Sequence, residues 1–168
     1  MRGTPYLLIA LVAACGAAAG KPAVPEIQRP AGAAQAVGVV HSIRTIPEAC
    51  ARLEGVFTGQ TTPYQFKAVR TSASCQPRAR WVDAAKIKPS PAAGWVLNDV
   101  IHIPSAACPS QQAVVRVWRK PTAIIPPKLD GQGRSRLYLD EATQAAKAKT
   151  MPAVAMYAAE MSVEGKGC

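Results

Sequence analysis

Hydrophobic and polar residues alternate along much of the chain after residue 39. In MYAAEMSVEG, residues 156–165, Tyr157, Met161 and Val163 fall on one side and the charged residues on the other. A similar pattern, rich in β-branched and aromatic residues, recurs in ARLEGVFTG, PYQFKAVRT, RARWVD, DVIHIP, AVVRVWRK and RLYLD. Because stretches of Gly, Pro, Ser and Asn separate these runs, the pattern predicts about seven short antiparallel strands. The expected fold is mainly β, a small antiparallel sandwich or barrel.

Helical patterns are scarce in this sequence. The best candidate is DEATQAAKAK, residues 140–149, in which Asp140 suits the N-cap and lysines suit the C-terminal end. Pro152 follows the segment and would end the helix. The short stretches PEAC and DAAK each predict a single turn, the second capped by Asp83.

The N-terminal part has a composition different from that of the rest. Residues 15–38 are dominated by Ala, Gly and Pro and contain no aromatic residue, which predicts a flexible tether. Residues 39–168 are then expected to form a single β-rich domain, long enough to bury a core.

The first residues resemble an export signal. Arg2 is followed by the apolar run YLLIALVAA, which is too short to span a bilayer. VAAC, residues 12–15, resembles the lipobox of bacterial lipoproteins, which implies a signal peptide of residues 1–14 and a lipid attached to Cys15. The alternative is cleavage by ordinary signal peptidase after about residue 20, which would give a plain secreted form. The expected location is periplasmic or anchored in the outer membrane, with secretion as the alternative.

Both cleavage sites leave the same cysteines for cross-linking. An even number of cysteines in an exported chain predicts two disulfides, formed among Cys50, Cys75, Cys108 and Cys168. Three pairings are open. The similar turns SASC and SAAC, each preceding a basic run, favour Cys75 with Cys108 and therefore Cys50 with Cys168.

Residues typical of catalysis are few. The chain has neither G-x-S-x-G nor H-E-x-x-H, and its histidines are His41 and His102. His102 alternates with isoleucines and is expected to point away from the core. Asp83 and Asp99 lie near strand ends, where we interpret them as a helix cap and a turn residue. We therefore assign no catalytic residue, no metal site and no cofactor.

Charge is the more informative property. The chain has 20 Lys and Arg against 10 Asp and Glu, a net charge of +10. Four arginines lie in or near expected strands that carry tryptophans, and they predict a basic face for an anionic partner: Arg78, Arg80, Arg116 and Arg119. In an exported protein the expected partner is an anionic envelope component or an acidic protein rather than nucleic acid. A solvated basic surface without a dedicated ligand is the alternative, and membrane contact is expected only through the lipid anchor.

The signal, the tether and the cysteine count together resemble small uncharacterised exported proteins of Gram-negative bacteria. The resemblance implies a compartment and no mechanism. In general design only, the chain resembles periplasmic lysozyme inhibitors and toxin-immunity lipoproteins, which favours a non-catalytic binding or inhibitor module. The alternative is an enzyme acting on cell-wall or lipid substrates, which a polar pocket joining His102 with Asp99 or Asp83 would favour.

The assignment of Cys15 can be tested by labelling cells with an acyl-chain probe. The wild-type protein should take up the label, and Cys15→Ser should lose it, because lipid attachment at a lipobox requires the cysteine. A mature N-terminus at Gly20 or Lys21 would contradict the lipoprotein assignment.

Overall fold

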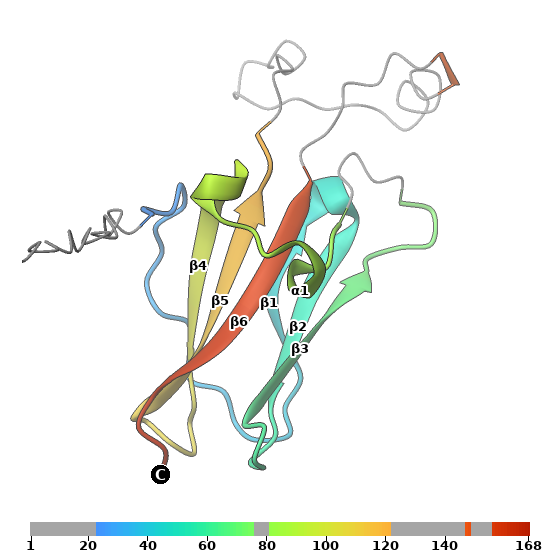
Figure 1. Cartoon of the computed structure of the whole chain (residues 1–168). Coiled ribbons are helices and arrows are strands. Elements are labelled where there is room, and N and C mark those ends of the chain that lie inside the picture. Colours follow the sequence, from blue (N-terminus) through green and yellow to red (C-terminus); the bar gives the residue numbers. More distant parts are fainter. Residues whose placement is uncertain (1–22, 76–80, 122–146, 149–155) are drawn as a thin grey trace, which may run out of the picture.

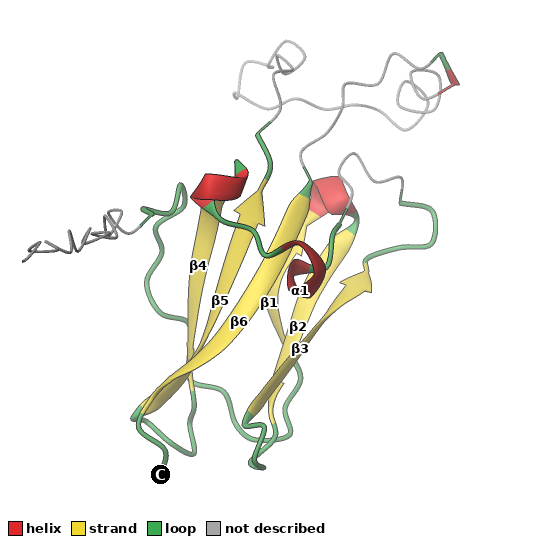
Figure 2. Ribbon diagram, in the orientation of Figure 1, coloured by secondary structure: helices red, strands yellow, loops and turns green. Residues whose placement is uncertain are grey.

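The computed structural model describes residues 23–75, 81–121, 147–148 and 156–168. Within these residues, six strands form two antiparallel sheets of three strands each (Figures 1 and 2). The first sheet has the order β1 (His41–Ile46), β2 (Ala51–Phe57) and β3 (Tyr64–Arg70). The second has the order β4 (Val96–Pro104), β5 (Gln111–Arg119) and β6 (Tyr157–Gly165).

The two sheets pack face to face around the main hydrophobic core, and a smaller buried cluster of Trp95, Leu97, Trp118 and Ala158 lies on the other face of the second sheet. Leu53 of β2 and Val115 and Val117 of β5 are completely buried in the main core. Met161 and Val163 of β6 pack against it, as the alternation in this segment predicts. Burial of one face of each sheet is what a period-two pattern produces, and the prediction of a mainly β, antiparallel fold is confirmed.

Five of the seven predicted runs are strands, and the count of seven is not confirmed. RLYLD lies outside the described residues. Of RARWVD only residues 81–83 are described, and they contribute an isolated bridge between Trp81 and Tyr157. β1 was not predicted. The register of β1 shifts between Ser42 and Arg44, so both Ile43 and Arg44 point inward and the alternation is broken.

The two short helical turns predicted from the sequence are both present in the structure. The 3-10 turn η1 (Pro47–Ala49) lies in PEAC, and the helix α1 (Ala84–Ile87) lies in DAAK. Asp83 caps α1 as predicted, because its carboxylate accepts a hydrogen bond from the Ala85 amide. A second 3-10 turn, η2 (Pro91–Ala93), precedes β4. The predicted helix 140–149 lies almost wholly outside the described residues.

Residues 26–38 are hydrogen-bonded to the sandwich, although they belong to the segment that the sequence predicted as a flexible tether. They form an extended strap that begins by running parallel to β4 at the edge of the second sheet (Figure 1). The amides of Ile27, Gly32 and Gln35 donate to carbonyls of β4 at 2.8–2.9 Å. The strap thus satisfies backbone groups that an edge strand would otherwise leave unpaired. Composition did not predict it because these bonds involve the backbone and need no hydrophobic pattern.

All the longer connections between strands meet at one end of the sandwich. β3 and β5 end there, and β4 and β6 begin there, at the top of Figure 1. The strap also begins at this end, since Glu26 pairs with Leu97 near the start of β4. The opposite end carries the turns 58–63 and 105–110, and we call it the turn end.

The disulfides are Cys50–Cys75 and Cys108–Cys168, each with a Cα–Cα distance of 5.8 Å. All four predicted cysteines are therefore bonded, but the predicted pairing is wrong. Cys50 and Cys75 lie at the end where β3 stops, whereas Cys108 and Cys168 lie at the turn end beside the last residues of β6. The similar SASC and SAAC turns are at opposite ends of the sandwich, so their cysteines cannot meet.

Peptide mapping without reduction should recover Cys50 linked to Cys75 and Cys108 linked to Cys168. The bridges span 25 and 60 residues, and the chain-entropy model assigns them about 3.5 and about 4 kcal/mol respectively. Replacing Cys108 and Cys168 together by Ala should therefore lower the melting temperature at least as much as replacing Cys50 and Cys75. A linked peptide containing Cys75 and Cys108 would contradict this connectivity.

Candidate functional site

The most buried charged group among the described residues is the carboxylate of Asp99, which is 0 % exposed. Asp99 lies on the inner face of β4. Its Oδ1 accepts from Arg29 Nε at 3.1 Å, and its Oδ2 accepts from Arg29 Nη2 at 2.6 Å and from Arg44 Nη1. Three parts of the chain thus meet at one carboxylate: the strap, β1 of the first sheet and β4 of the second.

Both carboxylate oxygens accept hydrogen bonds from the two arginines, and the group itself is not exposed to solvent. The side chain of Arg44 is 15 % exposed and that of Arg29 is 38 % exposed, so only Arg29 reaches the surface. A buried carboxylate needs such charged donors, because its desolvation is otherwise too costly. Asp99 is therefore a structural residue within β4, and its interpretation as a turn residue is wrong.

His41 and Tyr64 form a second polar contact inside the sandwich, near the turn end. His41 Nδ1 lies 3.2 Å from the Val39 carbonyl, and Nε2 lies 2.8 Å from the Tyr64 hydroxyl. Because a carbonyl only accepts, Nδ1 is the donor and Nε2 accepts from Tyr64. Burial raises the pKa of the Tyr64 hydroxyl. Gly55 makes the contact feasible, since a Cβ there would lie 1.8 Å from the hydroxyl oxygen.

A cavity of about 400 Å³ lies between the strap, β1 and β4. Its walls include Ile43, Ile101 and Ile103, and Arg29 and His41 stand at its polar side. Arg29 and His41 are hydrogen-bonded to Asp99 and Tyr64 respectively, and the lining also contains Gln35 and Ser42. The described lining therefore combines an apolar wall with polar groups, of which Arg29 and His41 already have partners within the chain.

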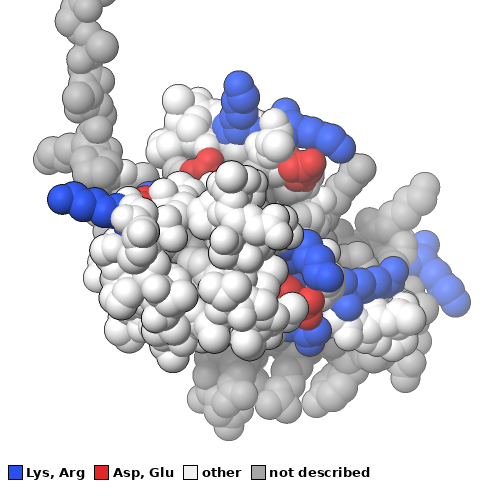
Figure 3. All heavy atoms as spheres, turned by 90° about the horizontal axis from the view of Figure 1, so that it is seen from below, with Lys and Arg blue, Asp and Glu red and all other residues white. Residues whose placement is uncertain are grey.

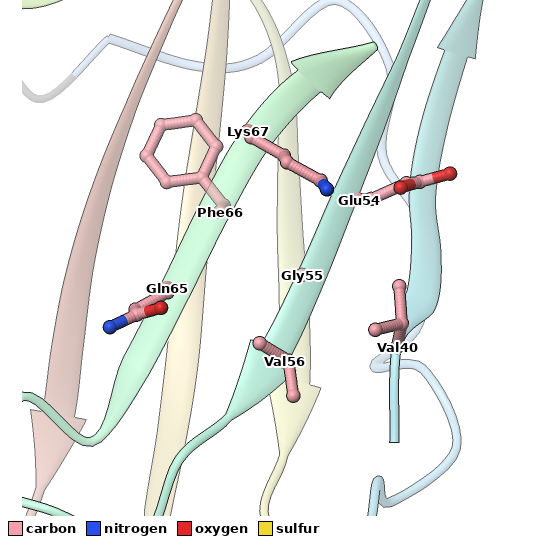
Figure 4. Close-up of a pocket in the computed structure, with 7 residues that line it drawn as sticks. All are labelled: Val40, Glu54, Gly55, Val56, Gln65, Phe66 and Lys67. Atoms are coloured by element: carbon pink, nitrogen blue, oxygen red, sulfur yellow. The ribbon is translucent and has the colours of Figure 1, made fainter. Parts of the chain in front are cut away.

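Two further hollows lie on the first sheet and at its edge. A groove of about 550 Å³ runs between α1, Phe66 of β3 and Met161 of β6. A shallow one of about 180 Å³ opens on the outer face of β2 and β3 (Figure 4). There Lys67 extends toward Glu54, which is directly opposite in register, while Phe66 leaves the strand on the other side toward the core.

The catalytic arrangement considered for an enzyme does not occur. His102 points to the outer face of the second sheet, as predicted, whereas Asp99 points into the core. Asp83 is an exposed helix cap, with a side chain that is 56 % exposed. The sheet itself therefore separates His102 from Asp99. Among the described residues, no group of three or more His, Cys, Asp or Glu could hold a metal ion.

Of the four arginines of the predicted basic face, Arg116 and Arg119 lie within the described residues. Arg78 and Arg80 lie outside them. Arg116 donates to Ser162 and to Glu164 on β6, both at 2.9 Å, and so lowers the pKa of Glu164.

Arg119 is engaged in the same way, but with the strap. Its guanidinium forms a bidentate ion pair with the carboxylate of Glu26, in which Nε lies 2.7 Å from Oε2. The hydrogen bonds from Arg119 lower the pKa of Glu26, and the same pairing raises the pKa of Arg119. Asn98 also donates to Glu26 at 3.0 Å. Arg119 therefore fixes the first residue of the strap to the ends of β4 and β5.

Further basic side chains lie in the half of the sandwich where β3 and β5 end, which we call the basic end. Arg70 ends β3 and Lys120 follows β5, whereas Lys86 and Lys88 lie in and directly after α1, beside residues 159–161 in the first half of β6. All four are exposed, as are two acidic residues of the same half, Glu48 in η1 and Asp83. Lys86 lies 3.9 Å from Asp83, a long and exposed pair of small energy. Arg70 donates to the carbonyls of Ser72 and Cys75 rather than to an acid.

The turn end is almost without charge by comparison. The turns 58–63 and 105–110 contain no charged residue, and Lys166 is the one charge in residues 166–168. Figure 3 views the molecule from this end, and uncharged side chains cover most of the visible surface. Charge is thus distributed unevenly along the length of the sandwich, a feature that residue counts over the whole chain do not reveal.

Comparison with known proteins finds no family model, no curated protein and no solved structure that matches this chain. Two disulfides are typical of a protein that works outside the reducing cytoplasm. In the part of the chain that the structure describes, no helix is both long and apolar enough to cross a membrane.

Asp99→Asn should destabilise the fold strongly, because it leaves two inward-facing arginines without a counter-charge. The expected loss is about 3–5 kcal/mol in the free energy of unfolding, measured by denaturant titration. Amide exchange at Ile27 and Gly32 should also accelerate as the strap loosens.

Glu54→Gln is the matched control, since Glu54 pairs with Arg52 on the outer face at 2.6 Å. Arg52 is 43 % exposed, so this change should cost less than about 1 kcal/mol. Equal losses for the two variants would show that Asp99 has no special role.

Proposed function

We propose that the protein is an exported, lipid-anchored envelope protein, a non-catalytic binding module whose basic end takes an anionic partner. The observation that carries the proposal is the segregation of charge between the two ends of the sandwich. Apart from the Glu26–Arg119 pair, the basic end carries Arg70, Lys86, Lys88 and Lys120 against the exposed acids Glu48 and Asp83. In the turns 58–63 and 105–110 and residues 166–168 of the turn end, Lys166 is the one charged side chain.

The two segments whose described ends lie at the basic end are also rich in basic residues by sequence. Residues 71–95 contain four basic residues and one acidic residue. Residues 120–156 contain six basic residues and three acidic ones. The predicted Arg78 and Arg80 belong to the first of these segments. A rigid scaffold that presents connecting segments at one end is a common arrangement for binding sites.

The pairing of Arg116 and Arg119 changes the composition of the proposed site. Each guanidinium already has a carboxylate partner within the chain, Glu164 for Arg116 and Glu26 for Arg119. An anion would have to displace that partner. Lys88 and Lys120 are better candidates, because they are exposed and form no ion pair with a described residue.

Binding to inorganic polyphosphate, a soluble anionic probe, tests this function. Affinity should fall steeply between low and physiological salt, because exposed charges are screened over about 8 Å at physiological ionic strength. Replacing Lys88 and Lys120 together by Gln should weaken binding without a change in melting temperature.

The matched control replaces Lys67 and Lys166 by Gln, which removes the same charge from the outer face and the turn end. If both double variants weaken binding equally, charge acts over the whole molecule and the basic end is not a site. Binding that does not depend on salt would point to another surface.

A further inference from the structure

The strap determines the end of the sandwich from which the preceding chain departs. Because it runs parallel to β4, residue 26 is at the basic end and residue 35 is near the turn end. Glu26 is held there by its pair with Arg119, by Asn98 and by its backbone bond to Leu97. A lipid on Cys15 would therefore be attached to the molecule at the basic end.

The connection between the anchor and the strap is short. Ten residues, 16–25, lie between Cys15 and Glu26, which as a coil extend on the order of 20 Å and at full stretch less than about 40 Å. β5 has nine residues, so the sandwich is about 30 Å long along its strands. If the turn end faced the membrane, residues 16–25 would have to reach along the whole length of the sandwich and would be almost fully extended.

Resting on the proposed function, we propose that the anionic partner is the layer of acidic phospholipid headgroups of the membrane that holds Cys15. The anchor brings the basic end to that surface, and the excess of Lys and Arg provides the attraction. The anchor holds the protein at the membrane, and the basic patch adds an electrostatic attraction that orients the domain on it. Phosphate oxygens of acidic headgroups are the chemical groups that the lysines contact.

The three tryptophans report the orientation directly, because all of them lie toward the basic end. Trp81 bridges to the first residue of β6, Trp95 precedes β4, and Trp118 is next to the last residue of β5. Energy transfer from tryptophan to dansyl-labelled headgroups falls steeply with distance. The acylated protein is reconstituted on phosphatidylcholine vesicles with and without phosphatidylglycerol.

Transfer should be higher on vesicles that contain phosphatidylglycerol and should fall to the phosphatidylcholine value at high salt. In a second measurement, the mature Cys15→Ser chain is bound to the same vesicles without an anchor. Its partition onto phosphatidylglycerol should decrease by up to about fivefold for each lysine removed at Lys88 and Lys120. The control variant at Lys67 and Lys166 should keep the wild-type partition.

The outcomes separate this inference from the proposed function. Salt-dependent polyphosphate binding at Lys88 and Lys120, combined with equal transfer on both kinds of vesicle, would leave the binding function standing and overturn the membrane surface as the partner. Loss of both responses would overturn both proposals. A mature chain without an acyl group on Cys15 would also overturn the membrane inference, because the anchor that positions the basic end would be missing.

Discussion

The carboxylate of Asp99 is the constraint on which the rest of the structure depends. It is fully buried and must keep charged donors, and those donors come from the strap and from β1. One residue of the second sheet therefore determines both where the strap runs and how the first sheet faces the second. Apolar contacts in the core supply most of the burial, but they are not directional and tolerate sliding between sheets. The ion cluster provides the directional element.

The route of the strap links this core interaction to the surface. Once Arg29 is drawn inward to Asp99 and Glu26 is paired with Arg119, the strap can only run from the basic end to the turn end. It then crosses to begin β1, where Val37 bridges to Phe57. The same segment protects the edge of β4 from pairing with other chains. An extended Ala, Gly and Pro segment can follow this route because it lacks bulky side chains that would need a place between the sheets.

Local patterns predicted the strands well, and long-range partners explain what they missed. Alternation predicted β6, and the N-cap preference of aspartate predicted the cap at Asp83. Both signals depend on residues that are close in sequence. The bulge at Ile43 removed the alternation from β1, and Asp99 looked like a turn residue because its partners are 55 and 70 positions away. Disulfide pairing and the pairing of Arg119 likewise depend on which segments share an end of the sandwich. That information is in the topology and not in any short stretch of sequence.

The internal pairing of arginines is also what gives the surface charge its direction. Arg116, Arg119, Arg29 and Arg44 share three carboxylates, Glu164, Glu26 and Asp99, so these ion pairs leave a net charge of only +1. By sequence, much of the excess positive charge belongs to residues 71–95 and 120–156, the segments between β3 and β4 and between β5 and β6. A molecule with its charge spread evenly would be attracted to an anionic surface in any orientation. A molecule with its charge at a single end is both attracted to the surface and oriented on it. If it is turned end over end, its charges lie about 30 Å from the surface, well beyond the screening length.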